Sequence, residues 1–150
     1  MKLTTKGRYA IRAMLDIALH REQGAVSLAE ISQRQKISQS YLEQLFAKLR
    51  RKELVDSVRG TGCVYTIHGD MQNITMAQIL NAIDEHSLTA TACCDQRNCQ
   101  DGAECLTHEL WLGLTDVIFN HLNHISLAEV VENLQVKYAD GELLYCEESA

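Results

Sequence analysis

The sequence predicts a mainly α-helical protein with one small β-hairpin. Apolar residues recur at the spacing of amphipathic helices through most of the chain, and two short apolar runs flank a turn with two glycines. Charge is divided unequally: residues 1–60 hold 12 Lys and Arg against 6 acidic residues, whereas residues 61–150 hold 2 against 14. A basic half in an acidic protein suits a module that binds nucleic-acid phosphates, although surface charge also varies without function.

Three helices are predicted in the basic half. Apolar residues at helical spacing predict a first helix over residues 5–21. Ser27, with Glu30 three residues later, forms a capping-box pattern that predicts the start of a short second helix. Ser38 is a favourable N-cap for a third helix over residues 38–51. Because a tight turn joins the last two, the sequence predicts a helix-turn-helix.

The outward face of the third helix carries groups that can pair with base edges. A glutamine amide pairs with adenine, a glutamate accepts from the cytosine amino group, and a serine serves in either way. Polar helix faces are common in all proteins, so this face alone leaves DNA binding and simple solvent exposure equally open. The face consists of Ser40, Tyr41, Glu43, Gln44, Ala47, Lys48 and Arg51.

A hairpin is predicted next. Residues 54–55 and 64–67 are expected to be short strands, and Gly60 and Gly62 allow a tight turn between them. Arg59 would lie near the tip, where an arginine beside a recognition helix can enter the DNA minor groove. We therefore predict a wing, and with it a winged helix-turn-helix; the alternative for Arg59 is a surface arginine on a turn.

The acidic half is predicted to contain helices on either side of a polar loop. Thr75–Gln78 is another capping-box pattern, and the helix that it opens would end near residue 86. Residues 87–104 lack sustained apolar periodicity and predict a loop. A long helix is expected over residues 105–123, followed by a short one from Ser126.

The long helix is expected to mediate dimerisation. It has more apolar positions than a small domain easily covers, so a second copy of the chain is the simplest partner, in a two-fold contact. Two-fold symmetry also fits palindromic double-stranded DNA. The alternative to dimerisation is that the long helix packs wholly within its own core. We expect three regions: a winged helix-turn-helix DNA-binding region at 1–70, the polar loop with dimerisation helices at 71–135, and a flexible tail at 136–150.

Clustered cysteines suggest a metal or redox role. The N-terminus has no apolar signal core and no stretch approaches the roughly 18 apolar residues of a membrane span, so we expect a cytoplasmic protein without membrane partners. Cytoplasmic thiols are kept reduced, which argues against structural disulfides. The candidates are Cys93, Cys94, Cys99, Cys105 and His108.

Spacing within this cluster leaves two metal chemistries open. Structural zinc sites usually contain close Cys-x-x-Cys pairs, which this segment lacks, so zinc is possible but less favoured. Iron–sulfur clusters are bound by cysteine thiolates, and imidazole replaces some of them in certain sites. No phosphate-binding loop and no nucleophile triad is evident, so we do not expect an enzyme.

Four motifs, in matching order and spacing, resemble the IscR family of bacterial iron–sulfur cluster regulators, which are winged helix-turn-helix transcription regulators. The resemblance extends from residue 1 to about residue 133. The motifs are Leu3-Thr-Thr-Lys-Gly-Arg-Tyr-Ala10, Ser38-x-Ser-Tyr-Leu-Glu-Gln-Leu-Phe46, Val58-Arg-Gly60 and Cys93-x5-Cys99-x5-Cys105-x2-His108-x2-Trp111.

The resemblance implies a homodimeric regulator that senses cluster status and controls cluster-assembly genes. The cluster-loaded protein would repress these genes, and the cluster-free form would still act at a second class of sites. The regulator would also be an activator, and the cluster-assembly machinery would donate the cluster. A 2Fe-2S cluster is implied on Cys93, Cys99, Cys105 and His108. DNA contacts are implied for Ser38, Ser40, Tyr41, Glu43, Gln44 and Arg59.

The chain departs from the family pattern in the wing and beside the first ligand. Thr61, Cys63 and Val64 replace residues that leave the family's wing backbone freer. Cys94 adjoins Cys93 and competes for the first ligand position, although the family spacing favours Cys93. The alternative function is a zinc- or thiol-redox-dependent winged-helix regulator without an iron–sulfur cluster.

Overall fold

The computed structural model describes residues 4–60, 62–83 and 105–139, and the fold is given for those residues. It is mainly helical, with one small antiparallel sheet, as predicted. The elements are α1 (Thr5–His20), η1 (Arg21–Gln23), β1 (Val26–Ser27), α2 (Leu28–Gln35), α3 (Gln39–Arg51), β2 (Val55–Val58), β3 (Val64–Ile67), η2 (Met71–Asn73), α4 (Met76–Ile83), α5 (His108–Asn123) and α6 (Leu127–Ala139).

Local capping signals set the predicted helix starts. The Ser27 amide donates to Glu30 Oε2 at 2.8 Å, and Ser27 Oγ accepts from the Glu30 amide at 3.2 Å. The Ser27 amide, together with the Ser27 hydroxyl that donates to the same Glu30 oxygen at 2.7 Å, lowers the pKa of the Glu30 carboxyl below its ordinary value. Thr75 and Gln78 form the same reciprocal pair at the start of α4. Both predicted capping boxes are therefore confirmed.

The sheet has the strand order β1-β3-β2 and contains one strand that the sequence did not predict. β1 has only two residues, Val26 and Ser27, and it pairs with β3 opposite Tyr65 and Val64. Two residues are too few to show alternation, so β1 exists through its tertiary pairing. β2 extends to Val58, past the predicted end at residue 55, because its residues pair in register with β3 as far as Val58 opposite Val64.

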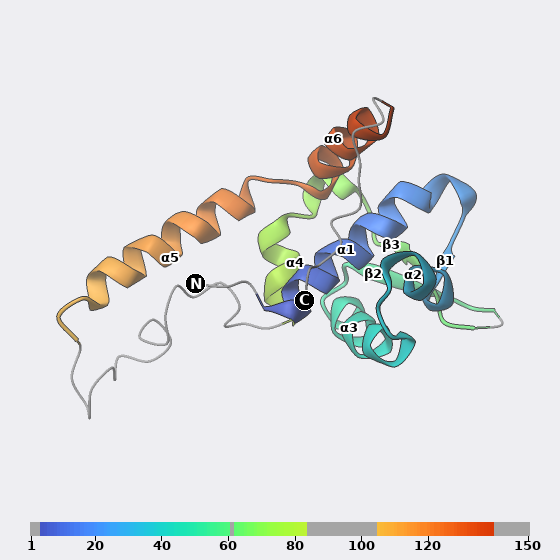
Figure 1. Ribbon diagram of the computed structural model, residues 1–150, viewed down its shortest axis with the longest axis horizontal. Coiled ribbons are helices and arrows are strands. Elements are labelled where there is room, and N and C mark those ends of the chain that lie inside the picture. The colour runs from blue at the N-terminus through green and yellow to red at the C-terminus, as the bar shows by residue number, and fades with distance from the viewer. Residues whose placement is uncertain (1–3, 61, 84–104, 140–150) are drawn as a thin grey trace.

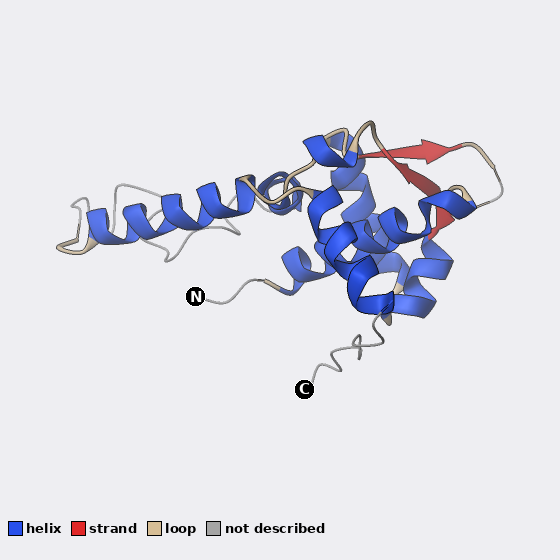
Figure 2. Cartoon of the chain, turned by 90° about the horizontal axis from the view of Figure 1, so that it is seen from above, coloured by secondary structure: helices blue, strands red, loops and turns tan. Residues whose placement is uncertain are grey.

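One main apolar core joins the winged helix-turn-helix to α4 and α6. Fully buried side chains from α1, α2 and α3 meet in it, among them Met14, Leu28 and Phe46. Figures 1 and 2 show α1 passing through the centre of this body, with α3 and the β2–β3 hairpin on the side away from α5. The recognition helix and the wing therefore share one packed support.

The long helix α5 extends away from that body (Figure 1), and part of its apolar stripe is uncovered. Leu110, Leu114 and Val117 are 61%, 41% and 65% exposed. Near its C-terminal end, Phe119 and Leu122 instead pack against Ala77 and Leu80 of α4. The alternative that the whole helix packs in its own core does not hold for the described residues.

One predicted helix boundary in the acidic half is wrong. α5 begins at His108 and not at residue 105, because Cys105–Thr107 form a turn in which the His108 amide donates to the Cys105 carbonyl at 3.1 Å. α6 ends at Ala139, so its last residues overlap the region that was expected to be a flexible tail at 136–150. Main-chain hydrogen bonding continues the helix there even though Val136 is exposed. The expected loop at 87–104 lies outside the described residues.

Candidate DNA-binding surface and cluster ligands

The N-terminal end of α3 presents the predicted base-reading residues together. Ser38 is its N-cap, and Ser38 Oγ accepts from the Tyr41 amide at 3.4 Å, which leaves the hydroxyl proton available for another acceptor. Ser38, Ser40, Glu43 and Gln44 are exposed. The structure thus brings these side chains to one end of one helix, where recognition helices contact base edges.

Tyr41 differs from its neighbours because it is half-buried. Its ring meets the edge of Tyr9 at a centroid distance of 5.8 Å, and Arg12 lies 5.7 Å from the centre of the Tyr9 ring. Burial, followed by the neighbouring Tyr9, raises the pKa of the Tyr41 phenol above its ordinary value. The hydroxyl therefore stays protonated at neutral pH and can donate to a phosphate or a base.

Glu43 has a neighbour that the sequence did not single out. Gln39 Nε2 lies 3.5 Å from Glu43 Oε1, across one turn of α3. A side-chain pair at this spacing on a helix surface contributes only about 0.2–0.5 kcal/mol. The signal, a Gln four residues before a Glu on one helix face, was present in the sequence.

Arg59 follows β2 directly and is exposed. Gly62, with φ of +109°, is in a backbone region that favours glycine, as expected for the turn. The hairpin is tied to the recognition helix by Phe46, whose ring centre lies 4.8 Å from that of Tyr65. The wing strand β3 and α3 therefore pack against each other, and the wing and α3 carry the predicted DNA contacts.

The C-terminal end of α3 adds Arg50, which the sequence did not place on the outward face, next to Arg51, which it did. A hollow of about 350 Å³ is lined by Ala47, Arg50, Arg51 and Tyr65. Arg50 Nη1 donates to Ser57 Oγ on β2 at 3.3 Å, so this guanidinium is held between the helix and the wing. Two arginines beside a hollow of this size suit a phosphate group.

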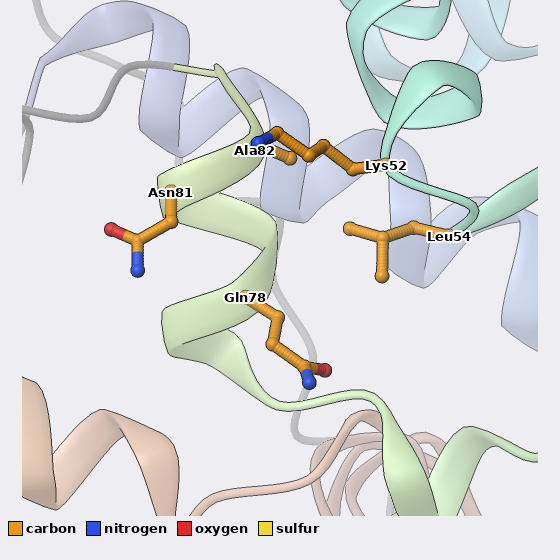
Figure 3. A pocket seen from close by; sticks show the side chains of 5 residues that line it. All are labelled: Lys52, Leu54, Gln78, Asn81 and Ala82. Atoms are coloured by element: carbon orange, nitrogen blue, oxygen red, sulfur yellow. The ribbon is translucent and has the colours of Figure 1, made fainter.

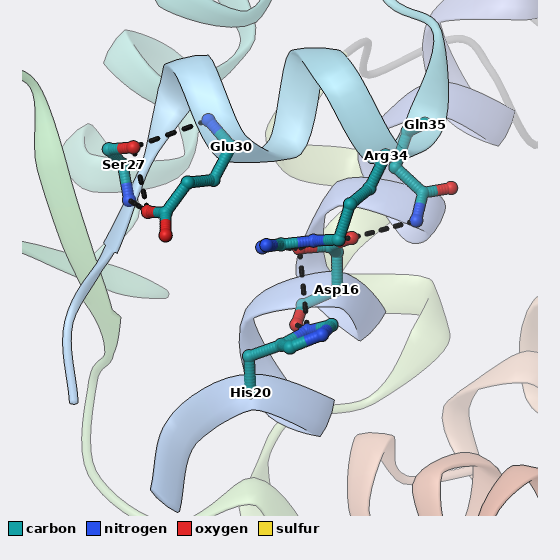
Figure 4. A network of polar contacts seen from close by, with 6 residues as sticks. All are labelled: Asp16, His20, Ser27, Glu30, Arg34 and Gln35. Atoms are coloured by element: carbon teal, nitrogen blue, oxygen red, sulfur yellow. Dashed lines mark hydrogen bonds and ion pairs between the residues drawn. The ribbon is translucent and has the colours of Figure 1, made fainter. Parts of the chain in front are cut away.

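α1 and α2 are joined beneath this surface by a buried carboxylate (Figure 4). Asp16 is 1% exposed and accepts hydrogen bonds from Arg34 Nη2 at 2.6 Å and from Arg34 Nε at 3.1 Å. Gln35 Nε2 donates to the same carboxylate at 2.8 Å. This network holds the last turn of α2, which precedes the turn into α3, against α1.

α3 is also linked to α4. Lys48 Nζ donates to the Ile83 carbonyl at 2.9 Å, although the sequence suggested that Lys48 faces outward with the DNA-reading residues. Farther along, a hollow of about 450 Å³ separates the end of α3 from α4; it is lined by Lys52, Leu54, Gln78, Asn81 and Ala82. Figure 3 shows Lys52 and Leu54 directed toward α4, and Asn81 directed away from them.

Two of the implied cluster ligands lie at the start of α5. Cys105 is half-buried, with its Sγ 3.7 Å from Thr107 Oγ1, and His108 is 4% exposed. The turn between them places thiol and imidazole about one helical turn apart. Cys93, Cys94 and Cys99 lie outside the described residues, and within the described ranges no group of three His, Cys, Asp or Glu side chains is arranged for a metal.

A family model described as Rrf2, iron-dependent transcriptional regulator, matches residues 3–133. The chain belongs to the Rrf2 family. It is 53% identical over 136 residues to the HTH-type transcriptional regulator IscR of Photorhabdus laumondii, with 91% of this chain and 82% of that protein covered. It is 50% identical over 141 residues to the regulator of the same name in Escherichia coli, with 94% and 86% covered.

Solved structures of Rrf2-family regulators have the same fold. IscR of T. potens matches with a TM-score of 0.74 and 29% identity, over 97% of this chain and 93% of that one. Oxidised Staphylococcus aureus CymR matches with a TM-score of 0.72 and 27% identity, over 88% and 97%. This Rrf2-family chain is a DNA-binding transcription regulator and not an enzyme. Within its described residues no helix is long and apolar enough to cross a membrane.

Proposed function

We propose that the chain is a cytoplasmic, homodimeric regulator that binds a 2Fe-2S cluster and reports cluster status to cluster-assembly genes, as a repressor and also as an activator. The observation that supports this most directly is the presence, in one fold, of an exposed recognition helix and a Cys105–His108 pair at the start of α5. The cluster-assembly machinery would supply the cluster. The proposed ligands are Cys93, Cys99, Cys105 and His108.

The donor set fits a 2Fe-2S cluster chemically. Thiolates bind iron in such clusters, and imidazole is an accepted substitute for some of them. Of the described pair, His108 is buried and Cys105 is half-buried, so both can bind in a site with restricted water access. When bound, the cluster supplies a redox-sensitive link among the four ligands. The adjacent Cys94 competes for the position that we assign to Cys93.

The DNA-reading role is assigned to Ser38, Ser40, Tyr41, Glu43, Gln44 and Arg59. Gln44 can pair with adenine, and Glu43, which lies one helical turn from Gln39, can accept from a cytosine amino group. A base without a donor would leave the Glu43 carboxylate desolvated and unpaired, so the same residue can reject other operators. Arg59 on the wing would enter the minor groove.

A second copy of the chain is proposed to cover the exposed stripe of α5. Leu110, Leu114 and Val117 form an apolar surface along a helix that leaves the body of the protein, and self-association is the simplest way to bury it. The two recognition helices would then face palindromic half-sites about one DNA turn apart. Sedimentation equilibrium checks this state, with an expected mass about twice the 16.9 kDa of one chain.

Cluster binding is proposed to change promoter occupancy by linkage. If loaded and cluster-free proteins differ in operator affinity, occupancy follows cluster supply. α5 carries His108 and packs through Phe119 and Leu122 on α4, and α4 contacts α1 and α3 in turn. A change at the ligands therefore has a packed route to the recognition helix.

Anaerobic iron and acid-labile sulfide analysis tests the proposed function. Wild-type protein and Cys94→Ala should contain both elements in equal amounts, whereas Cys93→Ala and His108→Ala should lose them. Each sample is then titrated against a duplex that the wild type selects from a random pool. Loaded and cluster-free wild type should differ about fivefold or more in affinity on at least one selected duplex.

Three outcomes contradict parts of this proposal. Colourless wild-type protein that contains zinc would favour the zinc-dependent alternative. Loss of iron in Cys94→Ala but not in Cys93→Ala would move the first ligand. Equal affinities of the loaded and cluster-free protein for every selected duplex would remove the sensing role.

Arg50 and Arg51 are predicted to bind DNA phosphates at the hollow beside Tyr65. Arg50→Gln and Arg51→Gln should each weaken binding to selected and scrambled duplexes by similar factors, because phosphates carry no sequence information. Each should also reduce the slope of log affinity against log salt by about 0.9. Fluorescence anisotropy at several salt concentrations measures both quantities. Arg21→Gln, on the exposed η1 turn, is the control and should leave the slope unchanged.

A further inference from the structure

We infer that Lys48 is a positioning residue that couples the end of α4 to the recognition helix, and thereby makes operator affinity respond to the cluster. This inference rests on the proposed function. It concerns the hydrogen bond from Lys48 Nζ to the Ile83 carbonyl, 2.9 Å long and partly buried, which joins positions 35 residues apart.

The bond joins a charged side chain to a main-chain carbonyl. Ile83 is the last residue of α4 that the structure describes, and its carbonyl accepts this hydrogen bond from α3. Lys48 supplies a charged donor, and charged donors make stronger hydrogen bonds than neutral ones. The position of Ile83 therefore influences where Lys48 is held.

Lys48 lies on the same side of α3 as the base-reading residues. It follows Gln44 by four residues and Ser40 by eight, and both spacings return to one helix face. The opposite side of α3 is fixed in the core by Leu42, Phe46 and other buried residues. A shift of Ile83 that is transmitted through Lys48 would therefore tilt or rotate α3 about its buried side. Gln44 and Ser40 would move with the helix.

Ile83 also lies close in the chain to the segment that contains two of the proposed cluster ligands. The chain continues from Ile83 into residues 84–104, which include Cys93 and Cys99, while His108 begins α5. A group bound jointly by Cys93 and His108 would tie the chain that follows α4 to the start of α5. Since Leu80 of α4 already packs on α5 through Phe119 and Leu122, that tie would restrain the last turn of α4 from both sides.

Lys52 provides a matched control. It caps α3 one turn after Lys48, carries the same charge, and borders the hollow between α3 and α4 (Figure 3). No hydrogen bond from its ammonium to another described residue is found. Loss of Lys52 therefore removes one cation near the DNA-binding face without removing the link to α4.

The test measures operator affinity of loaded and cluster-free protein for the wild type, Lys48→Met, Lys48→Arg and Lys52→Met. The full-length chain is titrated against the wild-type-selected duplex, and the ratio of the two dissociation constants is the readout. We expect the ratio in Lys48→Met to be about fivefold smaller than in the wild type, or equal to one. Lys48→Arg should retain most of the wild-type ratio, and Lys52→Met should retain all of it. Uniform weakening in both states would indicate phosphate contacts alone and would overturn the inference.

Hydrogen exchange separates failure of this inference from failure of the proposed function. In cluster-free protein, Lys48→Met should speed amide exchange in the last turn of α4, and Lys52→Met should not. A wild-type ratio of one on every duplex would overturn cluster sensing and the coupling with it. A full wild-type ratio in Lys48→Met, or unchanged exchange in α4, would overturn the role of Lys48 alone.

Discussion

Asp16→Ala is expected to destabilise the protein by about 2–4 kcal/mol. Breaking a buried ion pair by removing one partner typically costs about 3–5 kcal/mol, because the remaining charge is left without compensation. Asp16 is 1% exposed but Arg34 is 31% exposed, so water can solvate part of the guanidinium that has lost its partner. The decrease in the free energy of unfolding should therefore fall toward the lower end of that range. Urea unfolding at one fixed protein concentration measures this loss.

Asp56→Ala is the matched control for Asp16→Ala. Asp56 also pairs with a basic side chain, His68, at 2.9 Å, but the two side chains are 56% and 49% exposed. Exposed pairs contribute about 0–1 kcal/mol, so this variant should unfold close to the wild type. If the two variants lost equal stability, burial of Asp16 would not be the source of the effect.

The Asp16 network should also affect DNA binding. Arg34 and Gln35 belong to the last turn of α2, immediately before the turn into α3, and Arg12 Nη2 donates to the Gln35 carbonyl at 2.8 Å. Loss of Asp16 would release this end of α2. The affinities of the variant are measured at a temperature where it remains folded. A larger loss of affinity, relative to the wild type, for the selected duplex than for a scrambled one would show that the network positions the recognition helix.

Phe46→Ala is expected to cost about 3–5 kcal/mol, the range for large-to-alanine changes at buried aromatic sites. Phe46 is fully buried, it faces the core from α3, and its ring contacts Tyr65 of the wing strand β3. The variant would leave a cavity between the recognition helix and the wing. The same urea unfolding measurement applies, and Phe46→Leu, which fills much of the space, should lose considerably less.

A second readout connects Phe46 to function. Because its ring joins α3 to β3, Phe46→Ala should loosen the relative placement of the base-reading residues and Arg59. Specific affinity should then fall more than non-specific affinity, measured below the unfolding transition. Wild-type stability in Phe46→Ala would contradict the central place of this side chain in the core.

Local signals explain why most elements were predictable. The capping box at the start of α2 needs only a serine and a glutamate three residues apart, and Ser27 and Glu30 have this spacing. The start of α3 likewise depends on the Ser38 hydroxyl and an amide three residues later. The buried stripe of α3 follows from helical spacing alone. Family motifs further indicated the chemistry of Cys105 and His108, and the Rrf2 assignment confirms the kind of regulator.

Elements that depend on distant partners were not predictable in this way. β1 forms because two residues meet β3, nearly forty positions later in the chain. The start of α5 shifted by three residues because the turn at Cys105–Thr107 competes with helix, and periodicity does not resolve such ends. Neither feature has a sequence pattern of its own.

The sequence by itself determined the helices, their caps, the hairpin and the residue types that we propose for DNA and cluster contacts, since each depends on neighbours within a few positions. The tertiary structure decided which charged groups are partnered internally: Asp16 with Arg34, 18 residues away, and Lys48 with the end of α4, 35 residues away. Hydrophobic burial selects the helix faces that pack, and only that packing brings distant donors and acceptors within hydrogen-bonding distance.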